Sequence, residues 1–141
     1  MPHLMAALLT VRPGGARYVA YGVAAVLLVM TVVIGVSLPE TIEFTTAELV
    51  TLAFTLGGVL VVLHGVGRSR VVADEAGIRI VNGYRSHDFH WAAVAGISMK
   101  EGDPWPTLLT IDDARVMLFA IQRTDGPQAS AAVRRLRELA A

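Results

Sequence analysis

The sequence predicts an α+β membrane protein in which two transmembrane helices precede a small antiparallel β domain with one C-terminal helix. The 141 residues are 54% apolar and only 17% charged, whereas soluble domains carry about 25% charge. The apolar excess is concentrated between residues 18 and 66. Beyond residue 68 the chain has the composition of a soluble domain, with the short alternating runs that are typical of strands.

The first predicted transmembrane helix covers residues 18–38. This run has no charged side chain, and about 20 apolar residues are enough to cross about 30 Å of hydrocarbon. Pro39 ends the run, because proline continues a helix poorly. A cleaved signal peptide has a shorter apolar core, of about 7–15 residues, and a small-residue cleavage site. Neither property fits the segment that ends at Ser37-Leu38.

The second predicted transmembrane helix covers residues 48–67. Its ionisable side chains are Glu48, at its first residue, and His64, about one turn from its end. An ionisable group inside a span is a candidate functional residue, whereas a group near the end reaches the headgroups. Both interpretations of His64 stay open. Two consecutive helices that are apolar on all sides cannot be hidden in the core of so short a chain.

The charges that flank the two helices predict their orientation. Arginines precede the first helix and follow the second, and the connector at residues 39–47 carries Glu but no Lys or Arg. Lys and Arg collect on the cytoplasmic side of a membrane. Residues 1–17 are therefore predicted to be an N-terminal cytoplasmic tail, the connector to be external, and residues 68–141 to be a cytoplasmic domain. Within the tail, Leu4–Val11 fits either a segment lying on the membrane surface or a disordered tail.

Residues 68–141 are predicted to form short strands followed by a helix. Asn82-Gly83 indicates a hairpin, because both residues tolerate positive φ. Acidic pairs at Asp74-Glu75 and Asp112-Asp113 mark further turns. After Asp125-Gly-Pro127 the apolar spacing becomes helical, and this apolar stripe must cover a face or an end of the sheet. The predicted strands are residues 70–73, 77–81, 84–91, 94–99, 107–111 and 115–121.

Four short motifs carry a resemblance to a known family. They are Val72-Ala-Asp-Glu-Ala-Gly-Ile-Arg-Ile-Val-Asn82, Trp91-Ala-Ala-Val94, Gly102-Asp-Pro-Trp105 and Ala120-Ile-Gln122. In this order, behind two spans, they resemble the actinobacterial membrane proteins with a bacterial PH-like domain, the low-molecular-weight culture-filtrate antigen family. The resemblance implies a PH-like bent sheet or partial barrel that the C-terminal helix closes. PH domains have seven strands and six are predicted here, so one is missing or lies hidden beside the second span.

The sequence shows no pattern of catalytic, cofactor-binding or metal-ligating residues. The chain has no Cys, and His87 and His90 on one strand point to opposite faces. The acidic pairs lie where turns are predicted, without a pocket that would tune a catalytic carboxyl group. A formal net charge of zero argues against nucleic-acid binding. The protein is therefore predicted not to be an enzyme and to use no cofactor or metal.

The candidate interaction residues are Asp103, Pro104 and Trp105. Pro104 and Pro106 stiffen this loop and present the Trp105 ring with little loss of entropy. An exposed Trp suits a protein contact or insertion at the level of the lipid headgroups. The alternative is that Trp105 folds over the mouth of the β structure as part of the core.

Three functions fit these observations, and the last of them is an accessory subunit whose spans, rather than its domain, make the contacts. The first is a membrane-anchored, non-catalytic interaction module that holds an unidentified protein partner, which the family resemblance associates with the cell envelope. The alternative is a lipid-binding or lipid-sensing domain at the inner leaflet. From Arg68 onward the chain has ten basic and nine acidic residues, so only a weak contact with anionic lipid is expected. It would use Arg68, Arg70 and the Arg134-Arg135-Arg137 face, at about 1 kcal/mol per charge.

The predicted orientation can be tested with reporters fused after Ala141. A reporter that works only in the cytoplasm is expected to be active, and one that works only outside the membrane is expected to be silent, because the flanking arginines stay inside. Activity of the external reporter alone would reverse the orientation.

Overall fold

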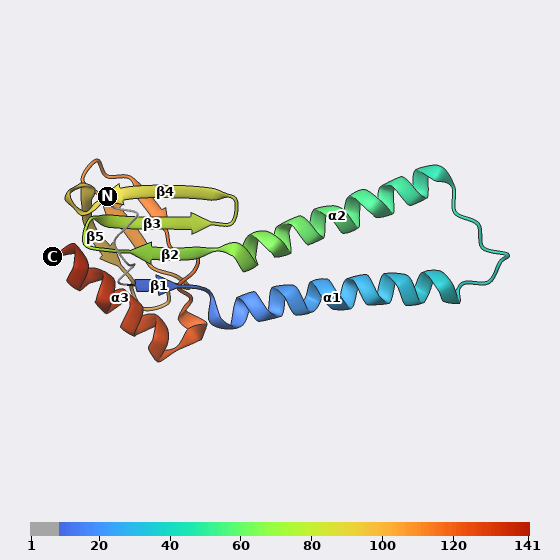
Figure 1. The fold of residues 1–141 in the computed structure, drawn as a ribbon, viewed down its shortest axis with the longest axis horizontal. Coiled ribbons are helices and arrows are strands. Elements are labelled where there is room, and N and C mark those ends of the chain that lie inside the picture. Colours follow the sequence, from blue (N-terminus) through green and yellow to red (C-terminus); the bar gives the residue numbers. More distant parts are fainter. Residues whose placement is uncertain (1–8) are drawn as a thin grey trace.

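Two antiparallel sheets and three helices make up the computed structural model, which describes residues 9–141 (Figure 1). The first sheet has the order β1-β2-β3-β4 and the second has the order β5-β6-β7. The helices are α1 (Gly14–Ser37), α2 (Thr46–Arg68) and α3 (Pro127–Ala140), with 3-10 turns η2 (Trp91–Ala93) and η3 (Arg123–Asp125). The strands are β1 (Leu9–Val11), β2 (Arg70–Ala73), β3 (Gly77–Asn82), β4 (Arg85–His90), β5 (Val94–Ser98), β6 (Thr107–Thr110) and β7 (Arg115–Met117).

Strand β1 and the start of α1 at Gly14 correct part of the prediction that residues 1–17 are a tail. Strand β1 pairs antiparallel with β2, with Thr10 opposite Val72, and Leu9 and Val11 pack against the core. With β1 the described residues have seven strands, the number that the resemblance implies, and β1 lies before α1 rather than hidden beside the second helix. Three residues are too few to show strand periodicity, which is why the pattern missed it. The rest of the predicted apolar segment, residues 4–8, lies outside the described residues.

Helices α1 and α2 form a hairpin that projects from the β domain (Figure 1). Because β1 precedes α1 and β2 follows α2, the hairpin is inserted between two neighbouring strands of one sheet. Both helices are long and apolar enough to cross a membrane, and only 6% of each apolar window is buried. The rest of the described chain therefore leaves their apolar side chains uncovered.

Local sequence explains where the two helices begin and end. Thr45 and Glu48 form a capping box, in which Glu48 N donates to Thr45 Oγ1 at 3.2 Å and Thr45 N donates to Glu48 Oε2 at 2.9 Å. This cap satisfies N–H groups that have no partner within the helix, so α2 begins at Thr46. Helix α1 ends at Ser37, and Leu38 before Pro39 is extended, as residues before proline prefer to be.

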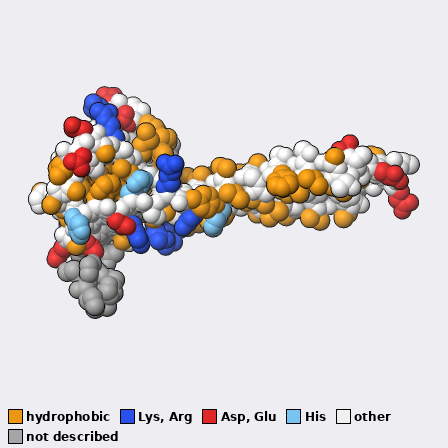
Figure 2. Space-filling view, turned by 90° about the horizontal axis from the view of Figure 1, so that it is seen from above, with side chains coloured by type: hydrophobic (Ala, Val, Ile, Leu, Met, Phe, Trp, Pro, Cys, Tyr) orange, Lys and Arg blue, Asp and Glu red, His pale blue; other side chains and the backbone are white. Residues whose placement is uncertain are grey.

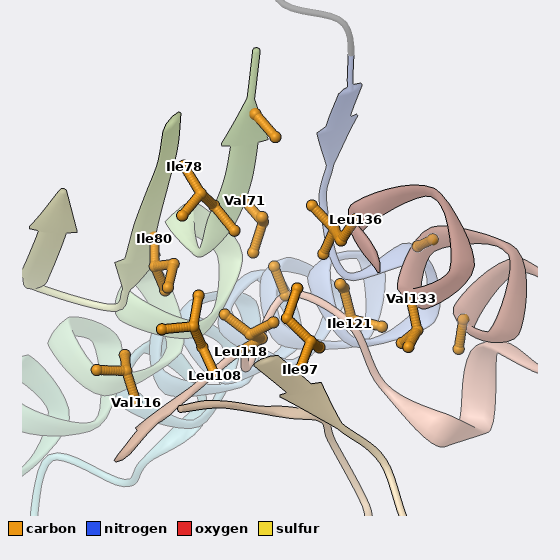
Figure 3. Close-up of a cluster of buried hydrophobic side chains, with 14 residues drawn as sticks. Val71, Ile78, Ile80, Ile97, Leu108, Val116, Leu118, Ile121, Val133 and Leu136 are labelled. Carbon is orange, nitrogen blue, oxygen red and sulfur yellow. The ribbon is translucent and has the colours of Figure 1, made fainter. Parts of the chain in front are cut away.

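The core lies between the two sheets and α3 (Figure 3). Val71 and Ile80 of the first sheet, Leu108 of the second and Leu136 of α3 are fully buried. Burial of a side chain of this size contributes about 1.5–3 kcal/mol. The apolar stripe predicted for the C-terminal helix is confirmed, since it faces this core. Its buried residues are Ala129, Ala132, Val133 and Leu136.

Of the predicted boundaries that differ from the structure, two bear on the site described below. Asn82 pairs with Arg85, so the β3–β4 turn is Gly83-Tyr84 rather than Asn82-Gly83, and of these only Gly83 has positive φ, at 62°. The turn begins at Gly83 rather than Asn82 because one class of two-residue hairpin turn has glycine at its first position, where φ is positive. The last predicted strand ends early, because β7 stops at Met117 and residues 118–121 form a turn. Asn82 helps to bind this turn, since its Oδ1 accepts from Phe119 N at 3.2 Å.

The pairing of β1 with β2 predicts a disulfide in an engineered variant of this cysteine-free chain. Thr10→Cys combined with Val72→Cys should cross-link on mild oxidation, because directly opposed residues lie within disulfide range. The measurement is the loss of maleimide-reactive thiols. Thr10→Cys with Asp88→Cys is the control, since the register places Asp88 three strands from Thr10. Equal oxidation of both pairs, or none in the first, would contradict the insertion of the hairpin.

Candidate functional site

The candidate site lies at the neck, where α1 and α2 meet the β domain. A groove of about 640 Å³ lies there, called the α2 groove below. One wall is the end of α2, and the other is formed by the β3–β4 turn and the loops that precede β6 and follow β7. Its lining residues are Val61, Val62, Gly65, Val66, Ser69, Asn82, Gly83, Tyr84, Arg85, Trp105, Phe119 and Gln122.

Direct hydrogen bonds fix the β3–β4 turn against α2. Tyr84 Oη donates to the carbonyl oxygen of Val61 at 2.6 Å. The Tyr84 ring lies on Gly65, where an added Cβ would come within 2.9 Å of the ring. Ser69 Oγ donates to Gly65 O at 3.0 Å and accepts from Gly83 N at 3.0 Å. The two walls of the groove are therefore held at a fixed distance from each other.

Trp105 lines the groove on the side of the β domain. The side chain is half-buried, and its ring meets Phe119 edge-on with 4.8 Å between the ring centroids. This edge-to-face arrangement is one that aromatic pairs favour. Trp105 is also not a member of the buried core cluster. Its position thus lies between the two alternatives that the sequence left open, a fully exposed ring and a core ring.

The other two candidate interaction residues hold the loop in shape. The Asp103 carboxylate accepts from Lys100 N at 2.9 Å, which closes a turn. The carbonyl oxygen of Pro104 accepts from Arg123 N at 2.8 Å, which ties the loop to η3. Asp103 is half-buried and Pro104 is exposed. The structure therefore brings only Trp105, of the three, to the groove.

Arginine side chains gather at the neck, whereas acidic side chains lie at the far tip of the hairpin (Figure 2). A second hollow of about 390 Å³ lies between α1 and α2 and is called the arginine pocket below. The residues that the sequence grouped with Arg68 and Arg70, at positions 134–137, lie elsewhere. They belong to the C-terminal half of α3, which leads away from the hairpin (Figure 1). The lining residues of the pocket are Arg12, Arg17, Tyr18, Tyr21, Gly67, Arg68 and Arg70.

Comparison with known proteins identifies the β domain. The model of the bacterial PH domain family matches residues 68–139, half of the chain. The chain belongs to the bacterial PH domain family. No curated protein and no solved structure matches it. The PH part of the resemblance drawn from the sequence is thus confirmed, and the narrower link to the actinobacterial antigen family stays a prediction. The matched segment contains β2 to β7, so the PH domain takes its remaining strand, β1, from ahead of the hairpin.

Sequence reasoning missed Tyr84 and Phe119 as parts of the site. Tyr84 lies in the turn that contacts α2, whereas the prediction placed both Tyr84 and Phe119 in strands. His64, which was singled out, is exposed on α2, and its Nδ1 lies 3.1 Å from Tyr21 Oη on α1. This hydrogen bond joins the two helices near the PH domain.

Two of the polar residues considered for catalysis, His87 and Asp74, take part in local structure. No group of three His, Cys, Asp or Glu side chains that could hold a metal occurs among residues 9–141. His87 stacks on Phe89 with 6.3 Å between ring centroids, on one face of β4 as alternation predicts. Asp74 Oδ1 accepts from the N–H groups of Ala76 and Gly77 at 2.8 and 2.9 Å, which confirms its turn role.

The contact between Tyr84 and Gly65 can be tested with a matched pair of variants. Gly65→Ala should push the Tyr84 ring away and break its bond to Val61, whereas Gly58→Ala meets nothing within 4 Å. Both changes gain similarly in helix propensity, so their difference isolates the contact. Gly65→Ala is expected to be about 1 kcal/mol less stable than Gly58→Ala, measured by thermal unfolding in detergent. Equal melting temperatures would show that this contact does not hold the PH domain on α2.

Proposed function

We propose that the chain is a membrane-anchored, non-catalytic interaction module whose PH domain holds another integral membrane protein at the inner surface of the cell membrane. The observation that supports this proposal is the α2 groove, because one of its walls belongs to a helix long and apolar enough to span a bilayer. Its other wall belongs to the PH domain. PH domains are generally non-catalytic interaction modules.

Insertion of the hairpin into a bilayer is supported by its uncovered apolar surface. Exposed side chains such as Val33, Ile34 and Phe54 would otherwise face water, and burying apolar surface is worth about 25 cal/mol per Å². The charges at the two ends of the hairpin support its direction, with arginines at the neck and, at the tip, Glu40 and Glu43 between the two helices and Glu48 in the first turn of α2. In this proposal both termini are cytoplasmic and the tip is external.

The position of the groove limits what can occupy it. With the hairpin inserted, Val61 and Val62 lie near the boundary between acyl chains and headgroups, and Trp105 lies beside them on the PH domain. Trp and Tyr side chains are enriched at this boundary. An occupant that touches both walls must itself reach the boundary, which a purely soluble protein does not do.

The outer face of α2 favours a helix as the occupant. A third hollow, of about 420 Å³, is lined by Phe54, Gly58, Val62 and neighbouring residues, and Val62 also belongs to the groove. The apolar surface is therefore continuous from Phe54 to Val66, about 18 Å along the helix. Gly58 has open space where a Cβ would lie, and small residues let helices approach closely. We therefore assign the groove to the inner end of a spanning helix of a partner, and the family resemblance associates such an assembly with the cell envelope.

Photocross-linking in intact membranes tests this proposal. A photoreactive amino acid replaces Trp105 or Val62, one on each wall of the groove, in the full chain. Both positions should label the same integral membrane protein, at residues that end one of its spanning helices. Ile111, which is 63% exposed on the β6–β7 turn, serves as the control position and should not label that protein.

The same partner should be lost from the purified complex when the groove is altered. Trp105→Ala is expected to reduce the recovered partner at least tenfold, because a central Trp in an interface contributes about 2 kcal/mol or more. Ile111→Ala should leave the recovery unchanged. Labelling of lipid alone, labelling of a soluble protein, or equal loss in both variants would reject the proposed function.

A further inference from the structure

A second feature of the neck, the arginine pocket, points to a ligand of different chemistry. Four of its seven lining residues are arginines and none is acidic. No ion pair involves any of the four arginines in the part of the chain that the structure describes, and residues 1–8 contain no Asp or Glu. The pocket thus gathers several positive charges around one hollow without a protein carboxylate to neutralise them.

The fold itself forces two of these charges together. The β1–β2 ladder ends with Val11 opposite Val71, and Arg12 and Arg70, the chain neighbours of this pair, both line the pocket. Like charges that line one hollow repel each other. An anion bound between them would remove this repulsion and would gain charge-assisted hydrogen bonds from guanidinium groups, which suit phosphate geometry.

The other two arginines are held in place by tyrosine rings. Arg17 lies 4.9 Å from the centroid of the Tyr18 ring and donates to its hydroxyl at 3.0 Å. Arg68 lies 5.2 Å from the centroid of the Tyr84 ring. Cation–π contacts of this kind restrict a long side chain, so less conformational entropy is lost when an anion binds.

The depth of the pocket indicates the source of the anion. This step rests on the proposed insertion of the hairpin, which places the first turn of α1 and the last turn of α2 among the headgroups of the inner leaflet. Phospholipid phosphates lie at that depth. We propose that the arginine pocket binds the phosphate-bearing headgroup of an anionic phospholipid. The site is not contained in the matched PH segment, since Arg12 and Arg17 precede the hairpin.

Native mass spectrometry of the full chain, supplied with equal amounts of phosphatidylglycerol and phosphatidylcholine, tests the proposal. The natural chain should retain phosphatidylglycerol with about a tenfold preference. Arg12→Gln with Arg70→Gln should reduce the preference to about twofold or less. The control is Arg134→Gln with Arg135→Gln, which removes the same formal charge from exposed positions on α3 and should keep the preference. Equal loss in both double variants would show unspecific charge attraction and overturn the site.

Two further measurements keep the proposal open to rejection if the pocket variant fails to fold. A photoactivatable phosphatidylglycerol should label the natural chain at residues 12–21 or 67–70, and equal labelling of α3 would overturn the assignment. Inorganic phosphate in the millimolar range should not displace the lipid, and its binding without any lipid preference would reassign the pocket to a soluble phosphate. None of these measurements needs a protein partner. A negative result would therefore reject the lipid site without rejecting the proposed interaction function.

Discussion

The pairing of β1 with β2 is the constraint on which the rest of the structure depends. Three residues before the hairpin pair with three residues after it. This pairing brings together the two ends of a chain segment that contains both long helices. Closing a segment of this length is entropically unfavourable, and β1 offsets it by burying Leu9 and Val11 against the PH core. The helices therefore leave the sheet side by side, and the neck with its groove and pocket exists only because they do.

Much of the fold could be predicted from the sequence because its signals are local. The two apolar runs are continuous, β2 was predicted with its observed bounds, and the stripe on α3 repeats with helical spacing. Strand β1 could not be predicted in this way. Three residues carry no periodicity, and the partner of β1 in the sheet lies about 60 residues away. The missing information was a pairing between distant segments, which local patterns do not contain.

The candidate site was predictable only in part, for the same reason. The two prolines beside Trp105 predicted a loop of restricted conformation. The hydrogen bonds that the Asp103 carboxylate and the Pro104 carbonyl oxygen accept agree with this prediction. What faces Trp105 could not be found, because Phe119 follows β7 and Val62 belongs to α2. These segments meet through the Gly83-Tyr84 turn, whose Tyr84 side chain contacts α2.

The hairpin and the PH domain are joined at several points in the neck, and these joints favour a fixed relation between the groove and the arginine pocket. The link from β1 to α1 is Arg12-Pro13 and the link from α2 to β2 is Ser69, so the PH domain has two short covalent connections to the hairpin. The Tyr84 bond to Val61 adds a third point of attachment away from both links. A body held at three points cannot swing about one hinge, so the groove and the pocket stay at one depth along the hairpin. Arg68 borders the pocket and lies over the Tyr84 ring that lines the groove, so a headgroup bound at Arg68 would neighbour a helix bound at Tyr84. The fold thus sets a cationic and an apolar surface side by side, as the headgroup and acyl layers of a leaflet are.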